Sequence, residues 1–559
     1  MSVRKLIAVL TKPVRKKLSE KSVLNVAIVG GGAGAVEMII RLLEAGGGDI
    51  PITFTIFEPR DKLGRGIAWE NETDSLIANM RLETLGPSYP EFELIESLLC
   101  AMGHAEAGAE YPSRNAMGDA LDRRWSDKQK DFPQHWSWRH ERKEVVDLEW
   151  NGKMATVIFR SGAKGGFDLV VLAIGNVPAK RDPHLPDSVR VINGWDGPAF
   201  KQIPADSDAL IRGAGLTSID ATIRLLEQGH HRGRRSIAWH SRSGELPFIR
   251  PKQLKNLAPI YLDYANLYAL IDQLKRQGKR LRLRQLKSLF KLEMASQKVN
   301  MAGKFEPGTD YQGFLNMYNL FRGPTKGIHF LRHGIASANY FSLWFSVAKL
   351  FDEYTIPLVW NALDDADKVV FLQKCRRDFD RFWAPIPVVN GRRIKDWLED
   401  KTIQLLRGSI VYQADQATGK ILFDRQLEDP LGTLSKQDLQ ERYADGFDVL
   451  IEAGGIPVDL AKLDSVIVEN LCKRRYLLPY KLHDPKADSP LSLGAKIDWY
   501  SGAVLAKDDK PHGWLFSLTG SLTAGAHRFT NSYLAVSASA NRVATTIMQE
   551  ACDEQADGA

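Results

Sequence analysis

The feature that most constrains this chain is a glycine-rich turn that occurs twice, each time between an apolar run and an amphipathic helical pattern. The first turn reads VGGGAGAVEM at residues 29–38, and the second reads RGAGLTSIDA at residues 212–221. A turn of this kind presents the free N–H groups of a helix start to a phosphate. Because one such turn holds one dinucleotide, the chain is predicted to hold two.

The first turn has the residue types that a pyrophosphate site needs. Gly30 permits a tight turn, Gly32 lets the backbone approach the pyrophosphate, and the small Ala35 lets the helix pack on the strand. Gly34 lies in the same turn. The next apolar run ends in Glu58, where a carboxylate can accept hydrogen bonds from ribose hydroxyls.

The second turn is similar, but its neighbouring strand ends differently. Gly213, Gly215 and Ser218 occupy the fingerprint positions. The next apolar run ends in HSRSG, so Arg242 stands near the position of the ribose carboxylate. Arginine can pair with a 2′-phosphate that a carboxylate would repel, so the sequence favours NADP(H) over NAD(H). The alternative is that Arg242 is a solvated loop residue.

One site has the acid Glu58 at the end of the neighbouring strand, and the other has Arg242 there. Together they predict FAD and NADP(H) as cofactors. Two further segments, 167–178 and 447–457, share Phe-Asp, an apolar run and a glycine turn, with Gly175 and Gly455 at the turns. Such turns border ligand clefts in open α/β sheets. The predicted fold class is therefore α/β, with two Rossmann-like dinucleotide-binding domains and a large, mostly helical insertion.

The order of the patterns predicts how the domains divide the chain. Residues 1–22 form a basic extension, for which a frayed amphipathic segment is favoured over contact with an anionic membrane surface. The FAD-binding domain comprises 23–200 and 446–550, and the NAD(P)-binding domain 201–255 and 401–445. Residues 256–400 form the helical insertion, in which the basic run 275–291 is either a solvated face, a funnel for an anionic substrate or a docking patch.

Composition excludes several other classes of protein. The four cysteines are scattered and form no CxxC pair, which excludes a disulfide reductase and fits a cytoplasmic location. No zinc-protease motif or phosphate-binding loop of nucleotide hydrolases occurs, so no metal site is predicted. Net charge is only +7, and aromatic residues do not alternate with the basic ones, so nucleic acid is not an expected partner.

Three stretches resemble the FAD-NAD(P)-binding protein family, which is related to N-hydroxylating and Baeyer-Villiger flavin monooxygenases. They are GGGAGA with IFEPRDKLGRGIAW, IRGAGLTSIDATIRLL with SRSGELP, and FDRFWAPIP, and the resemblance covers 24–250 and, more thinly, 355–545. It implies that certain residues approach the flavin. These are Arg65, Gly66, Asn79, Met80, Gly520 and Asn531, with Gly175 and Gly455 bordering the clefts.

The resemblance implies an FAD- and NADPH-dependent monooxygenase that uses oxygen and a small, amine or amino-acid substrate. The linker 192–201 lacks the FxGxxxHxxx(W/Y/F) signature, which disfavours the Baeyer-Villiger subclass. An NADPH:acceptor reductase and a redox-responsive binding protein remain as alternatives. No catalytic residue is identified, and a structural role is favoured for His333 and His527, the histidines nearest glycine loops. The sequence does not predict the oligomeric state.

Overall fold

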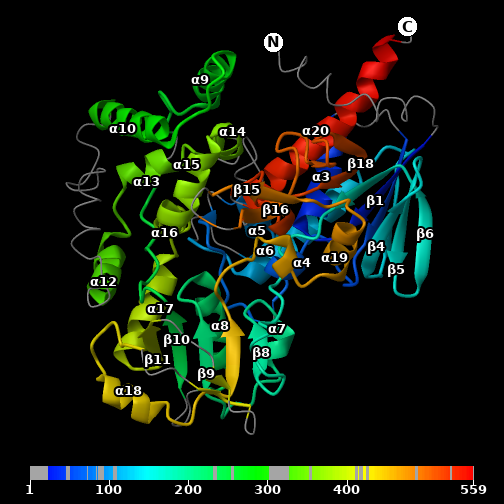
Figure 1. The fold of residues 1–559 in the computed structure, drawn as a ribbon. Helices are drawn as coiled ribbons and strands as arrows, with labels where there is room; N and C mark the ends of the chain where they lie inside the picture. The colour runs from blue at the N-terminus through cyan, green and yellow to red at the C-terminus, as the bar shows by residue number, and fades with distance from the viewer. Residues whose placement is uncertain are drawn as a thin grey trace.

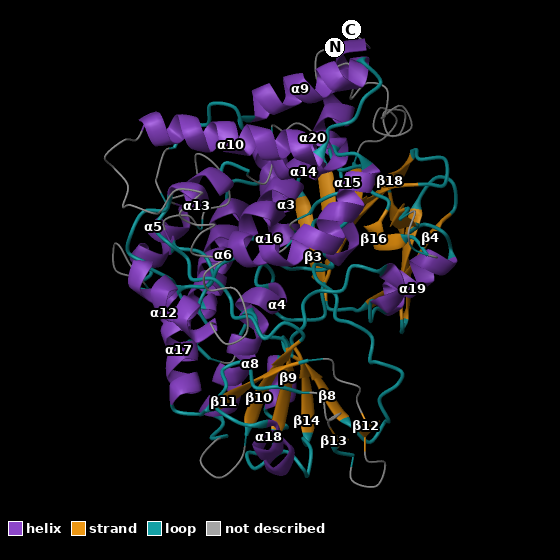
Figure 2. Cartoon of the chain, turned by 60° about the vertical axis from the view of Figure 1, so that its left-hand side comes forward, coloured by secondary structure: helices purple, strands orange, loops and turns teal. Residues whose placement is uncertain are grey.

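The chain contains one mostly parallel sheet, one fully parallel sheet and a helical insertion beside them (Figures 1 and 2). The computed structural model describes residues 23–557 except 46–50, 72, 83–84, 86–93, 105–109, 231–235, 254–256, 301–326, 352–354, 409–412, 415–418, 423–426, 485–486, 488, 529 and 531. The basic extension 1–22 and Asn531 therefore lie outside the described residues. The two sheets confirm the α/β fold class.

The first sheet has six strands in the order β17-β18-β7-β1-β2-β3, and only the β17–β18 pair is antiparallel. Its central strands are short apolar runs because both faces are covered. The strands are β1 (Leu24–Val29), β2 (Ile52–Phe57), β3 (Ser137–Glu141), β7 (Leu169–Leu172), β17 (Ala503–Leu505) and β18 (Pro511–Ser517).

Alternate residues of β1 point to two different cores. Val26 and Ile28 pack against α3 (Ala33–Glu44) and α20 (Tyr533–Asp557). Ala27 and Val29 pack towards an antiparallel meander and α19. The elements on this second side are β4 (Val145–Trp150), β5 (Ala155–Phe159), β6 (Gly162–Phe167), α19 (Val466–Lys473), β15 (Pro479–Leu482) and β16 (Leu491–Ala495).

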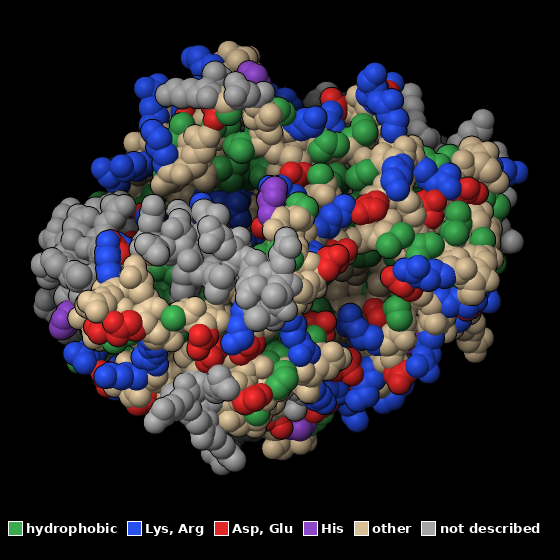
Figure 3. Space-filling model, turned by 60° about the horizontal axis from the view of Figure 1, so that its bottom comes forward, with side chains coloured by type: hydrophobic (Ala, Val, Ile, Leu, Met, Phe, Trp, Pro, Cys, Tyr) green, Lys and Arg blue, Asp and Glu red, His purple; other side chains and the backbone are tan. Residues whose placement is uncertain are grey.

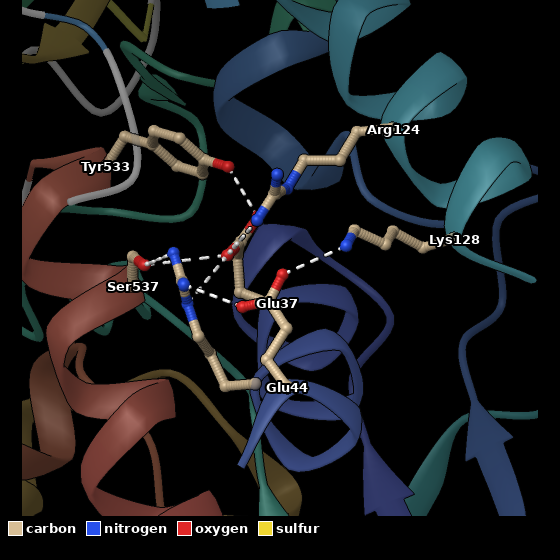
Figure 4. A network of polar contacts seen from close by, with 7 residues as sticks. Glu37, Glu44, Arg124, Lys128, Tyr533 and Ser537 are labelled. Atoms are coloured by element: carbon tan, nitrogen blue, oxygen red, sulfur yellow. Dashed lines mark hydrogen bonds and ion pairs between the residues drawn. The ribbon is translucent and has the colours of Figure 1, made fainter. Parts of the chain in front are cut away.

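A buried polar network joins the C-terminal helix to the helix of the first glycine turn (Figure 4). Glu37 of α3 is fully buried and accepts a 2.8 Å hydrogen bond from Arg124 Nε, on α6 (Arg114–Gln129). Its carboxylate also accepts a 2.5 Å hydrogen bond from the Tyr533 hydroxyl at the start of α20. Burial raises the pKa of Tyr533 well above its ordinary value, so the phenol remains a donor. The network fixes where α20 lies against the first sheet.

The second sheet has five strands in the order β11-β10-β9-β14-β8, all parallel. Helix α8 (Leu216–Glu227) covers one face and α18 (Lys436–Arg442) the other. The strands are β8 (Arg190–Asn193), β9 (Ala209–Arg212), β10 (Ile237–Ser241), β11 (Ile403–Arg407) and β14 (Val449–Glu452). The short hairpin β12 (Gln413–Ala414) and β13 (Ile421–Leu422) lies beside it.

Two strands of the second sheet were expected in the FAD-binding domain. β8 lies before residue 201, and β14 lies after residue 446, yet both pair in the second sheet. The physical reason is strand pairing, because β14 forms parallel hydrogen bonds with β9 on one side and with β8 on the other. The predicted boundaries at 200 and 446 are therefore wrong at these strands.

The insertion is helical where the structure describes it (Figure 1). Trp360 Nε1 donates to Gly525 O at 2.8 Å, and Asn361 Nδ2 donates to Ala526 O at 2.7 Å, which attaches the insertion to the C-terminal loop. The last helix instead packs on the second sheet through Ile394. The helices are α9 (Tyr264–Arg276), α10 (Leu283–Asn300), α12 (Gly327–Ser337), α13 (Leu343–Ala348), α14 (Thr355–Ala362), α15 (Asp365–Val370), α16 (Arg376–Trp383) and α17 (Val388–Glu399).

Ion pairs and hydrogen bonds hold the two sheet units together. Arg114, at the start of α6, donates to the buried Asp220 of α8 at 2.6 Å. Arg224 of the same helix donates to Asn71 Oδ1 at 3.1 Å. Arg393 of α17 donates to Ser75 O at 3.1 Å. The segments that follow the first glycine turn thus contact the helix that follows the second.

Candidate functional site

The first glycine turn lies at the carboxyl edge of the first sheet, between the ends of β1 and β7. Gly30 has a φ of +101°, and a β-carbon there would lie 2.4 Å from Ala173 O. Gly30 N donates to Phe57 O at 2.9 Å, and Ala173 N donates to Val29 O at 2.8 Å. Glycine is therefore required by both the backbone angle and the close approach of the next strand.

The second glycine turn repeats this geometry between β9 and β14. Gly213 has a φ of +145°, and its β-carbon would lie 2.3 Å from Ala453 O. Gly213 N donates to His240 O at 2.8 Å, and Ala453 N donates to Arg212 O at 3.0 Å. The similarity of the segments 167–178 and 447–457 thus corresponds to equivalent places in two sheets.

Both turns lead into a helix whose start can receive an anion. Helix α3 begins after Gly32 and α8 begins after Gly215, and neither glycine has a side chain to cap the helix. Neither helix has an acidic residue in its first turn. A β-carbon at Gly215 would meet nothing within 4 Å, and one at Gly32 would lie 3.5 Å from Gly66 Cα. The positive ends of both helices are therefore open to phosphate groups.

The next strand ends in an acid beside the first turn. Glu58 is 6% exposed, and its carboxylate accepts a 2.9 Å hydrogen bond from Gly31 N and a 3.1 Å hydrogen bond from Arg60 N. This places a carboxylate directly beside the backbone that is predicted to bind phosphate. Its position is the one expected for a ribose contact.

The second sheet ends in arginines instead. Arg242 follows β10 and is exposed. At the ends of the strands on either side, Arg212 pairs with Glu452 at 2.5 Å and Arg407 pairs with Glu428. His240 Nε2 donates a 2.9 Å hydrogen bond to Gly408 O, and burial lowers the pKa of His240. Figure 3, in which the bottom of the view of Figure 1 comes forward, shows a hollow in that face of the molecule with Lys or Arg side chains inside it.

The segments that the resemblance places near the flavin contain buried polar atoms without a partner in the part of the chain that the structure describes. They are Asn79 Oδ1, Asn176 Oδ1 and Thr519 Oγ1, and Ser218 Oγ is a fourth, beside the second turn. Unsatisfied buried polar atoms are rare in folded proteins and demand an explanation. Bound cofactors would supply the missing partners, so the residues present fit a dinucleotide at each turn.

The C-terminal loop contacts the Gly175 turn directly. Gly520 has a φ of +155°, and its β-carbon would lie 2.2 Å from Gly175 O. Ser521 N donates to Gly175 O at 3.1 Å, and Val177 N donates to Ser521 Oγ at 3.0 Å. A β-carbon at Gly175 or at the corresponding Gly455, whose φ values are +63° and +107°, would meet nothing within 4 Å, so the space directly beside both glycines is open.

Arg65 and Gly66 lie at the start of the short helix α4 (Gly66–Trp69), opposite the first turn. The Arg65 side chain is buried and turned towards α6, where its Nε donates to Asp122 Oδ2 at 2.7 Å and its guanidinium also pairs with Asp119. Asn79 and Met80 are half-buried and follow the buried Leu76 and Ala78. The roles of these residues at the flavin stay predictions.

The two histidines near glycine loops differ in their surroundings. His527 is buried, its Nε2 lies 3.0 Å from Trp499 O, and burial lowers its pKa to about 3. His527 is therefore neutral at physiological pH and has a structural contact. His333 is an exposed residue of α12. Within the described ranges there is no cluster of metal ligands and no helix long and apolar enough to span a bilayer.

Arg250 and Tyr111, which no motif in the sequence singles out, lie close together inside the molecule. Arg250 is 7% exposed, and its charge interacts with Tyr111 and Arg81. Arg250 joins the second sheet unit to the insertion, while Tyr111 and Arg81 lie in the first. Nothing in the local sequence LPFIRP indicates a buried arginine, because the burial results from contacts between distant segments.

Comparison with protein-family models gives one match, over residues 27–177, to the family described as FAD-NAD(P)-binding. This match confirms the resemblance for that part of the chain, which includes the first glycine turn, Glu58 and Gly175. A search of the curated proteins gives no match.

Solved structures whose backbone is similar to that of this chain include several monooxygenases. The cadaverine monooxygenase from Erwinia amylovora is 11% identical, with coverage of 95% of each chain and a TM-score of 0.49. L-lysine 6-monooxygenase from Pseudomonas syringae is 14% identical, covering 94% of this chain and 99% of that one, with a TM-score of 0.46. The ornithine hydroxylase from Pseudomonas aeruginosa is 12% identical, covering 94% and 99%, with a TM-score of 0.44. These identities are too low to transfer an activity.

Proposed function

We propose that the chain is an FAD-dependent oxidoreductase that NADPH reduces, and that it acts as a monooxygenase on a small substrate. The observation that carries the proposal is the repeated turn geometry, in which Gly30 and Gly213 approach Ala173 O and Ala453 O in the same way. Two equivalent phosphate sites in one chain support two dinucleotides, and the match to the FAD-NAD(P)-binding family supports flavin at the first.

Different residues bind different parts of the cofactors at the two turns. Backbone N–H groups at the starts of α3 and α8 bind the phosphates, and Glu58 orients the ribose at the first turn. Arg242 selects the 2′-phosphate at the second. The polar atoms of Asn79, Asn176 and Thr519 donate to or accept from the flavin edge, and the C-terminal loop at Gly520 excludes water from it. Bound FAD would accept a hydride from NADPH and deliver the electrons to oxygen.

The overall reaction consumes NADPH, a proton, oxygen and substrate, and it yields NADP⁺, water and the oxygenated substrate. We propose an amine or amino-acid nitrogen as the acceptor, because the linker 192–201 lacks the signature of the Baeyer-Villiger subclass. We place the enzyme in the cytoplasm, since its scattered cysteines fit a reducing compartment.

The test measures where the electrons of NADPH go. Purified protein should carry FAD, NADPH should reduce it without oxygen, and candidate amines should lower the peroxide released per NADPH in air. Label from ¹⁸O₂ should then appear in the amine product. Peroxide equal to NADPH consumed with every amine would leave an NADPH:acceptor reductase as the function. Flavin that NADPH does not reduce at a rate allowing turnover would indicate a redox-responsive binding protein.

A further inference from the structure

A buried arginine that has no carboxylate partner among the described residues lies where the three parts of the chain meet. Arg250 N donates to Ile386 O at 2.8 Å, and Arg250 Nη2 donates to Pro385 O at 3.1 Å. Its guanidinium carbon lies 5.7 Å from the ring centre of Phe345, and its Nε has no hydrogen-bond partner in the described part of the chain. Burial lowers the pKa of Arg250 to about 10, so the side chain is still charged at neutral pH.

A tyrosine hydroxyl and a second arginine lie near this charge. The Tyr111 hydroxyl is buried and makes no hydrogen bond of good geometry among the described residues, and the Arg81 guanidinium lies beside it. Burial raises the pKa of Tyr111, so it remains a donor. Arg81 lies 5.8 Å from the Tyr111 ring centre and pairs with Glu110 at 2.8 Å, which offsets the Arg81 charge. The cluster of Arg81, Glu110, Tyr111 and Arg250 therefore carries one net positive charge.

Leaving a charged group buried without a counter-ion is expensive, and such groups are normally paired. We propose that Arg250 and Tyr111 bind the carboxylate of the substrate. A carboxylate supplies one negative charge, it matches the planar fork of a guanidinium, and it accepts a further hydrogen bond from a phenol. The substrate class that fits is therefore a carboxylic acid, such as an amino acid.

The assignment to substrate rests on the proposed function and on the place of the cluster. Arg81 follows Asn79 and Met80, which are predicted to approach the flavin, and Ala78 N donates to Pro112 O at 2.9 Å beside Tyr111. Arg250 comes from the opposite side, on the link between the second sheet and the insertion. A carboxylate held there lies between the flavin-facing segment and the aromatic side chains of the insertion.

The test uses the FAD-loaded protein, with butyrate as the probe and neutral butyramide as its isostere, at constant ionic strength. Saturating butyrate should raise the Tm by about 2 °C, and butyramide should not. Arg250→Met should lose the butyrate response and melt at or above the wild-type Tm without ligand, because it removes an uncompensated buried charge. Arg123→Met, which removes an exposed arginine of α6, should keep the full response.

A lower Tm for Arg250→Met with the butyrate response intact would overturn the proposal and make Arg250 a structural residue. If Arg250→Met does not fold, Tyr111→Phe decides, since a halved response supports the carboxylate site and a full response contradicts it. A loss of NADP⁺ affinity in Arg250→Met that parallels the loss of butyrate binding would assign the anion to the dinucleotide and also overturn it. None of these measurements needs turnover, so their outcome can be distinguished from that of the peroxide and ¹⁸O₂ tests above.

Discussion

The two glycine turns have nearly the same backbone, but they present opposite charges to a ligand. At the first turn, Gly30 N donates to the end of β2, and Gly30 approaches the carbonyl group that follows β7. At the second turn, Gly213 N donates to the end of β10, and Gly213 approaches the carbonyl group that follows β14. Even the starts of the strands correspond, because Asp168 accepts from Asn25 N at 2.9 Å and Asp448 accepts from Asp208 N at 2.7 Å. We propose that the shared backbone binds phosphate at each turn, and that Glu58 and Arg242, at the ends of the neighbouring strands, decide which dinucleotide is bound.

The residues that follow the neighbouring strands, Glu58 after β2 and Arg242 after β10, differ in both charge and burial. The Glu58 side chain is buried and accepts a hydrogen bond from the backbone of the first turn. The Arg242 side chain, near the second turn, is exposed. A buried, bonded carboxylate is positioned before the ligand arrives, while an exposed arginine must be ordered by the ligand. The first site is therefore suited to a resident cofactor and the second to one that comes and goes.

The strongest test of the shared geometry is Gly30→Ala beside Gly213→Ala. Each added β-carbon would lie within 2.4 Å of a carbonyl oxygen, at a positive φ. Backbone strain and overpacking together should cost roughly 2–6 kcal/mol, enough to unfold much of the chain. Thermal melting should show similar losses for both. Gly152→Ala, at φ +90° with open space around it, should lose only about 1–2 kcal/mol.

Substitutions at Gly32 and Gly215 test the binding of each cofactor separately in a protein that still folds. Gly32 and Gly215 have room for a β-carbon and negative φ values, so Gly32→Val and Gly215→Val should fold. The branched side chains fill the space that a phosphate needs. Gly32→Val should lose FAD, and Gly215→Val should keep FAD but lose NADPH affinity at least about 100-fold, as several contacts of about 1.5–3 kcal/mol disappear.

Flavin content and anaerobic reduction by NADPH report these two outcomes separately. If Gly32→Val retained FAD and lost its response to NADPH instead, the assignment of the two sites would have to be exchanged. Retention of both cofactors in both variants would show that neither turn binds phosphate.

The sequence predicts the parts of the site that local chemistry determines. Gly30, Gly32, Gly213 and Gly215 stand out because strand, turn and helix patterns surround them. Sheet membership was not predictable, since the four-residue strands β8 and β14 have no local signal for the sheet they join. The burial of Arg250 was not predictable either, because it depends on Tyr111 and Phe345, which are far away in the sequence.

Arg242→Ala tests the charge that follows β10. If Arg242 contacts the 2′-phosphate, the variant loses one charge-assisted contact worth about 1.5–3 kcal/mol, a factor of about 10–100. The ratio of kcat/KM for NADPH to that for NADH should fall accordingly, through weaker NADPH binding. Arg160→Ala, at an exposed arginine of the meander, should leave the ratio unchanged. An unaltered ratio in Arg242→Ala would show that another group reads the 2′-phosphate.

Glu58→Gln should have the smallest effect, because the amide keeps one of the two acceptor oxygens in place. A charged acceptor contributes about 1.5–3 kcal/mol and a neutral one about 0.5–1.5 kcal/mol, so the change should cost about 1 kcal/mol, or roughly fivefold in FAD affinity. Isothermal titration of the apoprotein with FAD measures it, and the NADPH affinity of the refilled protein should not change. Glu58→Ala, which also leaves Gly31 N without its side-chain acceptor, should cost more. Equal FAD affinities for wild type, Glu58→Gln and Glu58→Ala would mean that the carboxylate only caps the turn, and that this acid has no part in choosing the dinucleotide.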